Sequence, residues 1–382
     1  MEMDMQNRES LDPGYPDDSK GVHGGDIYRN PGCLDFSANI NPLSMPPAVR
    51  EAAAAGIEAS VHYPDVFCTK LVQAIAAKEG VREDCIICGS GAADLIFALC
   101  LALKPRKALL TVPAFAEYEK ALRCAGCEPE YYVLKEERGF QIGEDILERL
   151  KHSVEIFFLC NPNNPTGVLT PPPLLERIVK QCSDAGILLV SDECFLEFLR
   201  EWERYSLKRF LGQAGIFVLK AFTKLYAMPG LRLGYGICTD TELLQKMHSC
   251  SQPWNVSLPA QYAGLAALRE EEYVRRTREY LKQEKEYLLT GFQKLWIPVY
   301  GAAANYIFFR AGAGLYEQLR IRGILIRDCS NYKGLGAGYY RVAVRTHEEN
   351  ERLMKALREV YPEGLTGGSH TSGSARREMD ER

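Results

Sequence analysis

Two loops of the chain have the composition of ligand-binding turns, and each follows an apolar run typical of a strand. Residues 89–94, Gly-Ser-Gly-Ala-Ala-Asp, lead into an apolar helix-like segment, so free backbone N–H groups would face an anion such as phosphate. A glycine turn of this kind is about as often simple chain geometry. Residues 161–167, Asn-Pro-Asn-Asn-Pro-Thr-Gly, form a loop held rigid by prolines and a glycine. It would present an asparagine amide to a ligand or would be a plain β-turn.

An acid, a lysine and an arginine stand at comparable positions further along the chain. Asp192 ends an apolar strand-like run, where an unpaired carboxylate is costly and needs a cationic partner, unless it caps a helix. Lys224 follows the next strand-like run, 32 residues later, which is the length of one strand–helix–strand unit. Arg232 comes eight residues after the lysine. Each residue has a structural explanation on its own.

Taken in chain order with the aromatic Phe115, which also follows a strand-like run, these residues make one coherent ligand site. The ligand that suits the set is pyridoxal phosphate. The lysine amine can bond covalently to its aldehyde, the acid can pair with the pyridinium nitrogen, and the glycine turn and arginine can bind its phosphate.

The elements that must position these residues alternate between strands and helices. Short β-rich runs, several apolar at every residue, predict a largely parallel sheet covered on both faces, with strands at 86–88, 108–112, 156–160, 187–191, 216–219 and 233–237. Prolines at the start and a glycine just past the end predict a helix at 173–185. A charged helical stretch at 269–289 leads into a smaller α+β unit with strands near 305–309, 324–327 and 339–344 and a last helix at 347–360.

We expect five segments along the chain. Residues 1–22 and 363–382 lack apolar periodicity and are expected to be disordered. Residues 23–64 form an N-terminal arm and part of the small domain, 65–285 form the large cofactor-binding domain, and 286–362 form the C-terminal small domain.

The composition excludes several classes of function. The 382 residues are 46% hydrophobic and 25% charged, which is ordinary for a soluble globular protein. A net charge of −4 provides no excess of positive charge that would attract nucleic acid or anionic lipid, so we do not expect a protein that binds either. No apolar run approaches the roughly 18 residues of a membrane span, and the polar N-terminus does not read as a signal peptide, so we expect a cytoplasmic protein.

The cysteines do not predict a metal site. Thirteen cysteines are too few for a disulfide scaffold of this length, and most lie in apolar segments, so we expect reduced thiols. Cys85/Cys88 and Cys124/Cys127 have the spacing of zinc ligands. The first pair lies in a predicted strand, where residues three apart point to opposite faces, which argues against a shared metal ion.

The motifs carry a family resemblance. Asn-Pro-Thr-Gly at 164–167, Asp192, Thr-Lys at 223–224 and Gly-Leu-Arg at 230–232 match the signature of fold-type I pyridoxal-phosphate enzymes of the class I/II aminotransferase superfamily in order and spacing. Four segments, 23–25, 34–43, 223–230 and 339–345, more closely resemble the threonine-phosphate decarboxylases of cobalamin biosynthesis, relatives of the histidinol-phosphate aminotransferases. The resemblance runs from about residue 23 to 360. It implies an α/β fold with a large domain built on a mostly parallel seven-stranded sheet and a smaller α+β domain.

The resemblance also implies roles for individual residues. Lys224 would bond to the cofactor aldehyde and Asp192 to its pyridinium nitrogen, as the two catalytic residues. The full cofactor-binding set would be Ala92, Ala93, Phe115, Asn164, Asp192, Thr223, Lys224, Arg232 and, from a second subunit of a homodimer, Tyr63. The substrate would be held by His23, Gly24, Asn39, Asn164, Arg327 and Arg341. Two departures from the wider superfamily are Phe195, where many relatives have tyrosine, and Ala221, where a hydroxyl residue often helps to bind phosphate.

The activity expected from this resemblance is decarboxylation of L-threonine O-3-phosphate to (R)-1-aminopropan-2-ol O-2-phosphate and CO₂. Serine phosphate is a variant substrate, and a histidinol-phosphate-type aminotransferase is the alternative reaction. A cofactor-binding regulator on the same fold would need a DNA-binding module, which the short polar segment ahead of His23 cannot form. The expected partners are a small phosphorylated amino acid and a second copy of the chain, with shared active sites.

Overall fold

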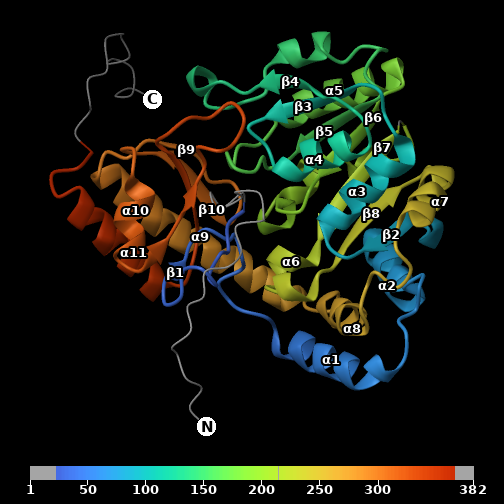
Figure 1. Cartoon of the computed structure of the whole chain (residues 1–382), viewed down its shortest axis with the longest axis horizontal. Coiled ribbons are helices and arrows are strands. Elements are labelled where there is room, and N and C mark those ends of the chain that lie inside the picture. The colour runs from blue at the N-terminus through green and yellow to red at the C-terminus, as the bar shows by residue number, and fades with distance from the viewer. Residues whose placement is uncertain (1–22, 214, 366–382) are drawn as a thin grey trace, which may run out of the picture.

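The computed structural model describes residues 23–213 and 215–365. The two ends expected to be disordered, 1–22 and all but the first residues of 363–382, lie outside this part of the chain. Figure 1 shows a large lobe built around one sheet and a smaller C-terminal lobe, with the N-terminal helix α1 (Pro47–Glu58) running along the lower edge.

The large lobe contains a seven-stranded sheet of order β2-β8-β7-β6-β5-β3-β4. Strand β8 is antiparallel to both of its neighbours, and the other strands run parallel to one another, so the predicted mostly parallel sheet is confirmed. The strands are β2 (Ile86–Gly89), β3 (Ala108–Val112), β4 (Glu130–Val133), β5 (Ile156–Cys160), β6 (Leu188–Asp192), β7 (Ile216–Ala221) and β8 (Gly234–Cys238). The sequence analysis missed β4, an edge strand with exposed residues at both ends.

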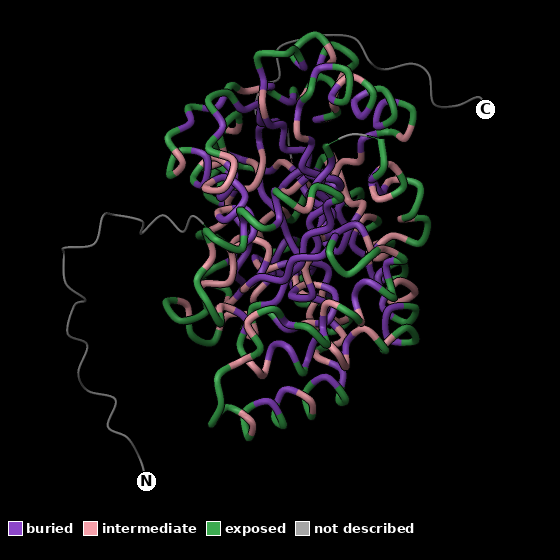
Figure 2. The backbone as a smooth tube through the Cα atoms, turned by 90° about the vertical axis from the view of Figure 1, so that its right-hand side faces the viewer, coloured by how far each residue is buried: buried purple, intermediate pink, exposed green. Residues whose placement is uncertain are grey.

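Helices cover both faces of this sheet, so its central strands β5, β6 and β7 are buried at nearly every residue. Within β5, Phe157 and Leu159 pack into one hydrophobic layer and Phe158 and Cys160 into the other, as the two-residue period of a strand requires. The first layer includes helices α2, α5 and α8, and the second includes α3, α4 and α7. These helices are α2 (Thr69–Glu79), α3 (Ala92–Leu103), α4 (Ala116–Cys124), α5 (Pro172–Ala185), α7 (Thr241–Cys250) and α8 (Leu258–Ala267). Figure 2 shows that the buried backbone is concentrated in the centre of the molecule.

Local signals set the helix ends. Helix α5 begins with prolines and stops at Gly186, whose φ of 69° is the left-handed conformation that favours glycine. Helix α11 (His347–Val360) begins at a capping box in which Thr346 and Glu349 bond each other's backbone N–H groups. The helices predicted at 173–185 and 347–360 are therefore confirmed to within a residue.

The small lobe is an antiparallel sheet of order β12-β13-β10-β9, with helices packed against it. Its strands are β9 (Val299–Gly301), β10 (Tyr306–Arg310), β12 (Arg327–Asp328) and β13 (Tyr339–Ala343), and its helices are α10 (Leu315–Arg320) and α11. The N-terminal strand β1 (Leu34–Asp35) pairs in parallel with β11 (Ile324–Leu325), so the N-terminal arm joins this lobe (Figure 1).

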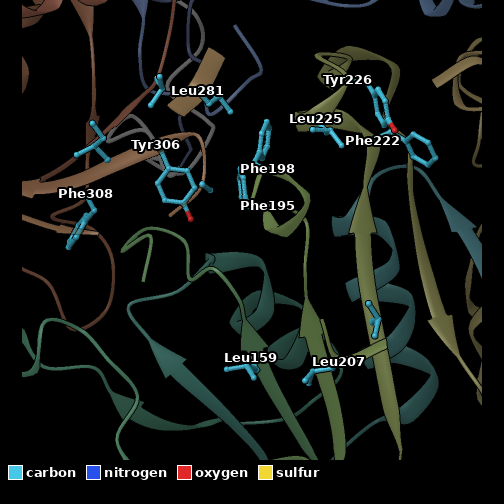
Figure 3. Close-up of a cluster of buried hydrophobic side chains, with 14 of the residues drawn as sticks. Leu159, Phe195, Phe198, Leu207, Phe222, Leu225, Tyr226, Leu281, Tyr306 and Phe308 are labelled. Carbon is cyan, nitrogen blue, oxygen red and sulfur yellow. The ribbon is translucent and has the colours of Figure 1, made fainter. Parts of the chain in front are cut away.

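A long helix and an apolar cluster connect the lobes. Helix α9 (Glu271–Lys294) contributes Leu281 to the cluster, which also contains Phe195 and Phe198 from the large lobe (Figure 3). The ring of Tyr306 on β10 lies edge-on to that of Phe195, with centroids 5.1 Å apart. Such contacts fix the lobes relative to each other at the point where the site residues meet.

The described residues contain no helix that is both long and apolar enough to cross a membrane. Within the same part of the chain, all thirteen cysteines are free and no group of three or more potential ligands is arranged to hold a metal ion.

Candidate active site

A cavity of about 520 Å³ lies at the carboxyl ends of strands β5, β6 and β7, closed on one side by the N-terminal arm and Arg341 of β13. Twelve of the residues predicted for the site line this cavity: His23, Gly24, Asn39, Ala92, Ala93, Phe115, Asn164, Asp192, Thr223, Lys224, Arg232 and Arg341. The topology gathers them because parallel strands end at the same edge of the sheet.

Lys224 reaches the cavity from a short helix, α6 (Phe222–Leu225), that follows β7 directly. Burial, followed by the positive charge of Arg341, lowers the pKa of its amine to about 8. A lysine with this pKa has a substantial neutral fraction near physiological pH, which a nucleophilic amine requires.

Asp192 is the last residue of β6 and is almost fully buried. Its carboxylate accepts hydrogen bonds from the hydroxyl of Tyr118 and from the backbone N–H of Cys194, the latter at 3.0 Å. Among the described residues these two donors hold the carboxylate and no cation pairs with it, so the pyridinium nitrogen of the cofactor stays its predicted cationic partner. Burial and the neighbouring Asp192 charge hold the pKa of Tyr118 well above its usual range, so this phenol remains a donor.

Tyr118 was missed by the sequence analysis. It lies in helix α4, stacks on Phe158 at 5.0 Å and meets the ring of Phe115 edge-on at 5.6 Å. The available signal was its place in Phe-Ala-Glu-Tyr, three residues after the aromatic that had been selected.

The turn before α3 forms a pocket for an anion. Ala92 and Ala93 are the first residues of the helix, so their backbone N–H groups have no acceptor within it. A Cβ on Gly91 would lie 2.3 Å from Nη2 of Arg232, so only glycine admits the guanidinium so close to the turn. Arg232 is anchored by donating to the carbonyls of Pro229, at 3.0 Å, and Ser90, at 3.5 Å. Thr223 lies buried at the same cavity.

Unpartnered polar atoms also lie at this cavity. Both side-chain polar atoms of Asn39 are buried without a hydrogen-bond partner, although the residue lines the cavity. Arg341 donates Nη1 to the side-chain oxygen of Asn164 and Nη2 to the carbonyl of Ser37 at 2.8 Å, and its Nε has no partner. Buried polar groups are normally satisfied, so these atoms indicate a polar ligand.

Two predicted residues lie outside this cavity. Arg327 borders an adjoining hollow of about 320 Å³ that shares His23 and Gly24 with the cavity, and it stacks over Tyr332, 5.0 Å from the ring centre. Tyr63 is exposed on the surface and stacks on Trp254 with ring centroids 4.5 Å apart. One subunit therefore does not bring Tyr63 into its own site.

The residues present suit pyridoxal phosphate. The lysine has a lowered pKa, a buried carboxylate faces the same cavity, and the glycine turn with Arg232 offers an anion site there. Phe115 supplies an aromatic face, and no hydroxyl stands at Ala221, which leaves one donor fewer at the phosphate end.

Comparison with known proteins gives consistent matches over nearly the whole chain. Residues 31–357 match the family model described as aminotransferase class I and II. A threonine-phosphate decarboxylase of Salmonella typhimurium is 40% identical, covering 87% of this chain and 92% of the relative. An adenosylcobalamin biosynthesis bifunctional protein of Leptospira interrogans is 30% identical, covering 89% of this chain and 41% of the relative. The solved histidinol-phosphate aminotransferase of Clostridium acetobutylicum superposes with a TM-score of 0.81 at 29% identity, covering 86% and 99% of the two chains.

Proposed function

The chain belongs to the aminotransferase class I and II family, and from this premise we propose that it is a pyridoxal-phosphate-dependent decarboxylase of L-threonine O-3-phosphate. Its products are (R)-1-aminopropan-2-ol O-2-phosphate and CO₂, and its pathway is cobalamin biosynthesis. The observation that carries the proposal is the 40% identity to a threonine-phosphate decarboxylase over most of both chains. The 30% identity to an adenosylcobalamin biosynthesis protein supports the pathway.

The roles of the residues follow from their chemistry. Pyridoxal phosphate, when bound, supplies an electron sink for the pair of electrons left when a bond at the substrate Cα breaks. Asp192, held by Tyr118 and the Cys194 N–H, keeps a proton on the pyridine nitrogen. Lys224 holds the cofactor and is the base or acid that moves a proton at Cα. The N–H groups of Ala92 and Ala93, together with Thr223 and Arg232, bind the cofactor phosphate.

With the cofactor bound, the residues that orient the substrate would decide whether the carboxylate or the hydrogen leaves Cα. Loss of the carboxylate gives CO₂ and an amine, and loss of the hydrogen leads to transamination. Arginine offers a planar, bidentate partner for a carboxylate or phosphate. Arg341 in the cavity and Arg327 beside it, with His23, Gly24 and Asn39, suit a substrate that carries both groups.

A histidinol-phosphate-type aminotransferase is the second candidate, favoured by the TM-score of 0.81 to a solved enzyme of that name. A product assay separates the candidates. The purified holoenzyme is incubated with threonine phosphate, serine phosphate or histidinol phosphate, with and without a 2-oxo acid. We expect CO₂ and a phosphorylated amine from threonine phosphate without any oxo acid. Amino transfer to the oxo acid without CO₂ would replace the decarboxylase with the aminotransferase.

The active form in this proposal is a homodimer. Exposed apolar side chains lie on α1, the loop that follows it, the segment leading into α8, and α8 itself: Ile57, Val61, Tyr63, Phe67, Trp254 and Tyr262. Helices α1 and α8 lie side by side at the lower edge of the large lobe (Figure 1). Patches of this kind commonly mark protein interfaces. With this face covered by a second copy, Tyr63 would reach the cofactor phosphate of its partner.

A further inference from the structure

One carboxylate at the cavity has no part in the mechanism above. Glu117 and Asp192 are the acidic residues among those that line the cavity. Asp192 serves the pyridine nitrogen, whereas Glu117 lies in the first turn of α4 with its side chain only 11% exposed. The proposed substrate is an anion, and a carboxylate in direct contact with it would oppose binding. Glu117 therefore requires a different role.

The contact of Glu117 is with the N-terminal arm. Its Oε1 lies 3.0 Å from Nε2 of His23, and the His23 ring stands 6.0 Å from that of Phe115. The His23 side chain is 53% exposed, so packing alone does not fix the ring. Among the described residues, Glu117 is the polar partner that orients it.

The arm around His23 is fixed to the rest of the substrate end. A Cβ on Gly24 would lie 2.2 Å from the carbonyl oxygen of Ser37, so the backbone packs against this residue at a distance that only glycine allows. The N–H of Gly25 donates to Oγ of Ser37 at 2.7 Å, and Arg341 donates to the carbonyl of Ser37 at 2.8 Å. These contacts fix the position of the backbone beside His23, and the contact with Glu117 orients the His23 ring.

We propose that Glu117 is a positioning residue for the substrate phosphate, acting through His23. With Nε2 held by Glu117, the other ring nitrogen, Nδ1, is directed to donate to a phosphate oxygen of the substrate. An imidazolium ring donates from both nitrogens, so one ring can bond the carboxylate and the phosphate at once. The inference rests on the proposed function, since it assigns the residue that orders the phosphate site of that activity.

The test compares holoenzymes of the wild type, Glu117→Gln, His23→Gln, the double variant and Glu119→Gln. Glu119 is the matched control, because it lies two residues further along α4 and pairs with Arg123 and Lys333 instead of His23. We expect Glu117→Gln to raise the KM for threonine phosphate about ten-fold while kcat stays within about two-fold, the size of a lost charge-assisted hydrogen bond. Glu119→Gln should match the wild type.

Two results would overturn the proposal. One is an unchanged KM in Glu117→Gln. The other is a double variant with a KM well above that of His23→Gln, because a residue that acts through His23 has no further effect once His23 is gone. Cofactor absorbance reports whether each variant is loaded and folded, so a general loss of structure would be recognised.

A second measurement keeps this inference distinct from the proposed function. The Kd of threonine phosphate is measured by following the change in cofactor absorbance as it is added, without turnover. A wild type that binds threonine phosphate and releases no CO₂ refutes the decarboxylase, while the Kd ratio between Glu117→Gln and wild type still decides the role of Glu117. Failure of the wild type to bind threonine phosphate at all would refute both.

Discussion

Nζ of Lys220 and Oε1 of Glu79 lie 2.7 Å apart, with both side chains almost completely buried. Lys220 is on β7, four residues before Lys224, and Glu79 ends α2. Glu79 also accepts hydrogen bonds from Lys208 at 2.7 Å and from the hydroxyl of Tyr235 at 2.6 Å. The pair thus ties a helix of the first layer to the strand that delivers the site's lysine.

Replacing Lys220 by methionine should destabilise the protein by about 3–5 kcal/mol, because it removes the buried cation of a buried carboxylate and leaves it only the more exposed Lys208. Lys208→Met is the matched control. Lys208 bonds the same carboxylate but is 25% exposed, so its loss should cost less than about 1 kcal/mol. Urea unfolding of the two apo-variants measures the difference. Equal losses in both would contradict the central place given to Lys220.

The same pair predicts a loss of stability in acid. Burial alone would raise the pKa of Glu79, but the charges of Lys220 and the hydrogen bonds of Lys208, Lys220 and Tyr235 outweigh it and lower the pKa to about 2. Between the ordinary value of 4.5 and about 2, the unfolded chain binds a proton at this residue that the folded chain does not. Stability should therefore fall with pH across this window by on the order of 3 kcal/mol.

The paired variant Glu79→Gln/Lys220→Met isolates this contribution. Its unfolding free energy should fall less steeply than that of the wild type between pH 4.5 and 2, since the titrating group and its cation are both absent. Parallel curves for wild type and double variant would show that other carboxylates account for the acid sensitivity.

Lys224 should acquire the cofactor with an unusual pH dependence. Its neutral amine is the reactive form, and burial followed by the charge of Arg341 lowers its pKa to about 8. The rate at which the apoenzyme takes up pyridoxal phosphate should rise through about pH 8 instead of through the ordinary lysine value of 10.5. Arg341→Gln removes a positive charge and should move the midpoint upward. Stopped-flow absorbance measures the rate, and Lys224→Ala should show no covalent uptake.

Asp192 and Tyr118 should have unequal effects on turnover. Asp192→Asn should still bind cofactor but lose at least about 100-fold in kcat, because a neutral amide cannot keep the pyridine nitrogen protonated. Tyr118→Phe removes one donor to a carboxylate that keeps its charge and its bond from Cys194, so about a ten-fold loss is expected. Near-normal turnover of Asp192→Asn would refute the role assigned to it.

The sequence predicts those parts of the fold in which one physical signal dominates. Residues 156–160 are apolar throughout and 108–112 are apolar except for Thr111, and these runs match β5 and β3 to the residue; 347–360 matches α11, whose start a capping box marks. Strand β4 was not predicted, because an exposed edge strand lacks a continuous apolar run.

The site was predicted less completely than the fold. Residues that follow strands were predicted because the strand ends converge at one edge of the sheet. Tyr118 and Glu117, the partners of Asp192 and His23, lie on α4, and only tertiary packing decides which side of that helix faces the site. Lys220 was not selected for a related reason: its partners Glu79, 141 residues away in the sequence, and Glu197 come close to it only in the folded chain.

The shared active site predicts complementation between inactive subunits. Lys224→Ala abolishes the site of its own subunit, and Tyr63→Phe removes the hydroxyl that the proposed dimer lends to its partner's site. A hybrid dimer of the two then has one site with both defects and one with neither. Random reassembly of an equal mixture should restore about a quarter of the wild-type sites. Subunits are mixed, unfolded and refolded together, and CO₂ release is compared with that of each variant refolded alone. Since Tyr63 is 78% exposed in the single chain, a purely local role would give no gain over the average of the two variants, and that result would exclude shared sites.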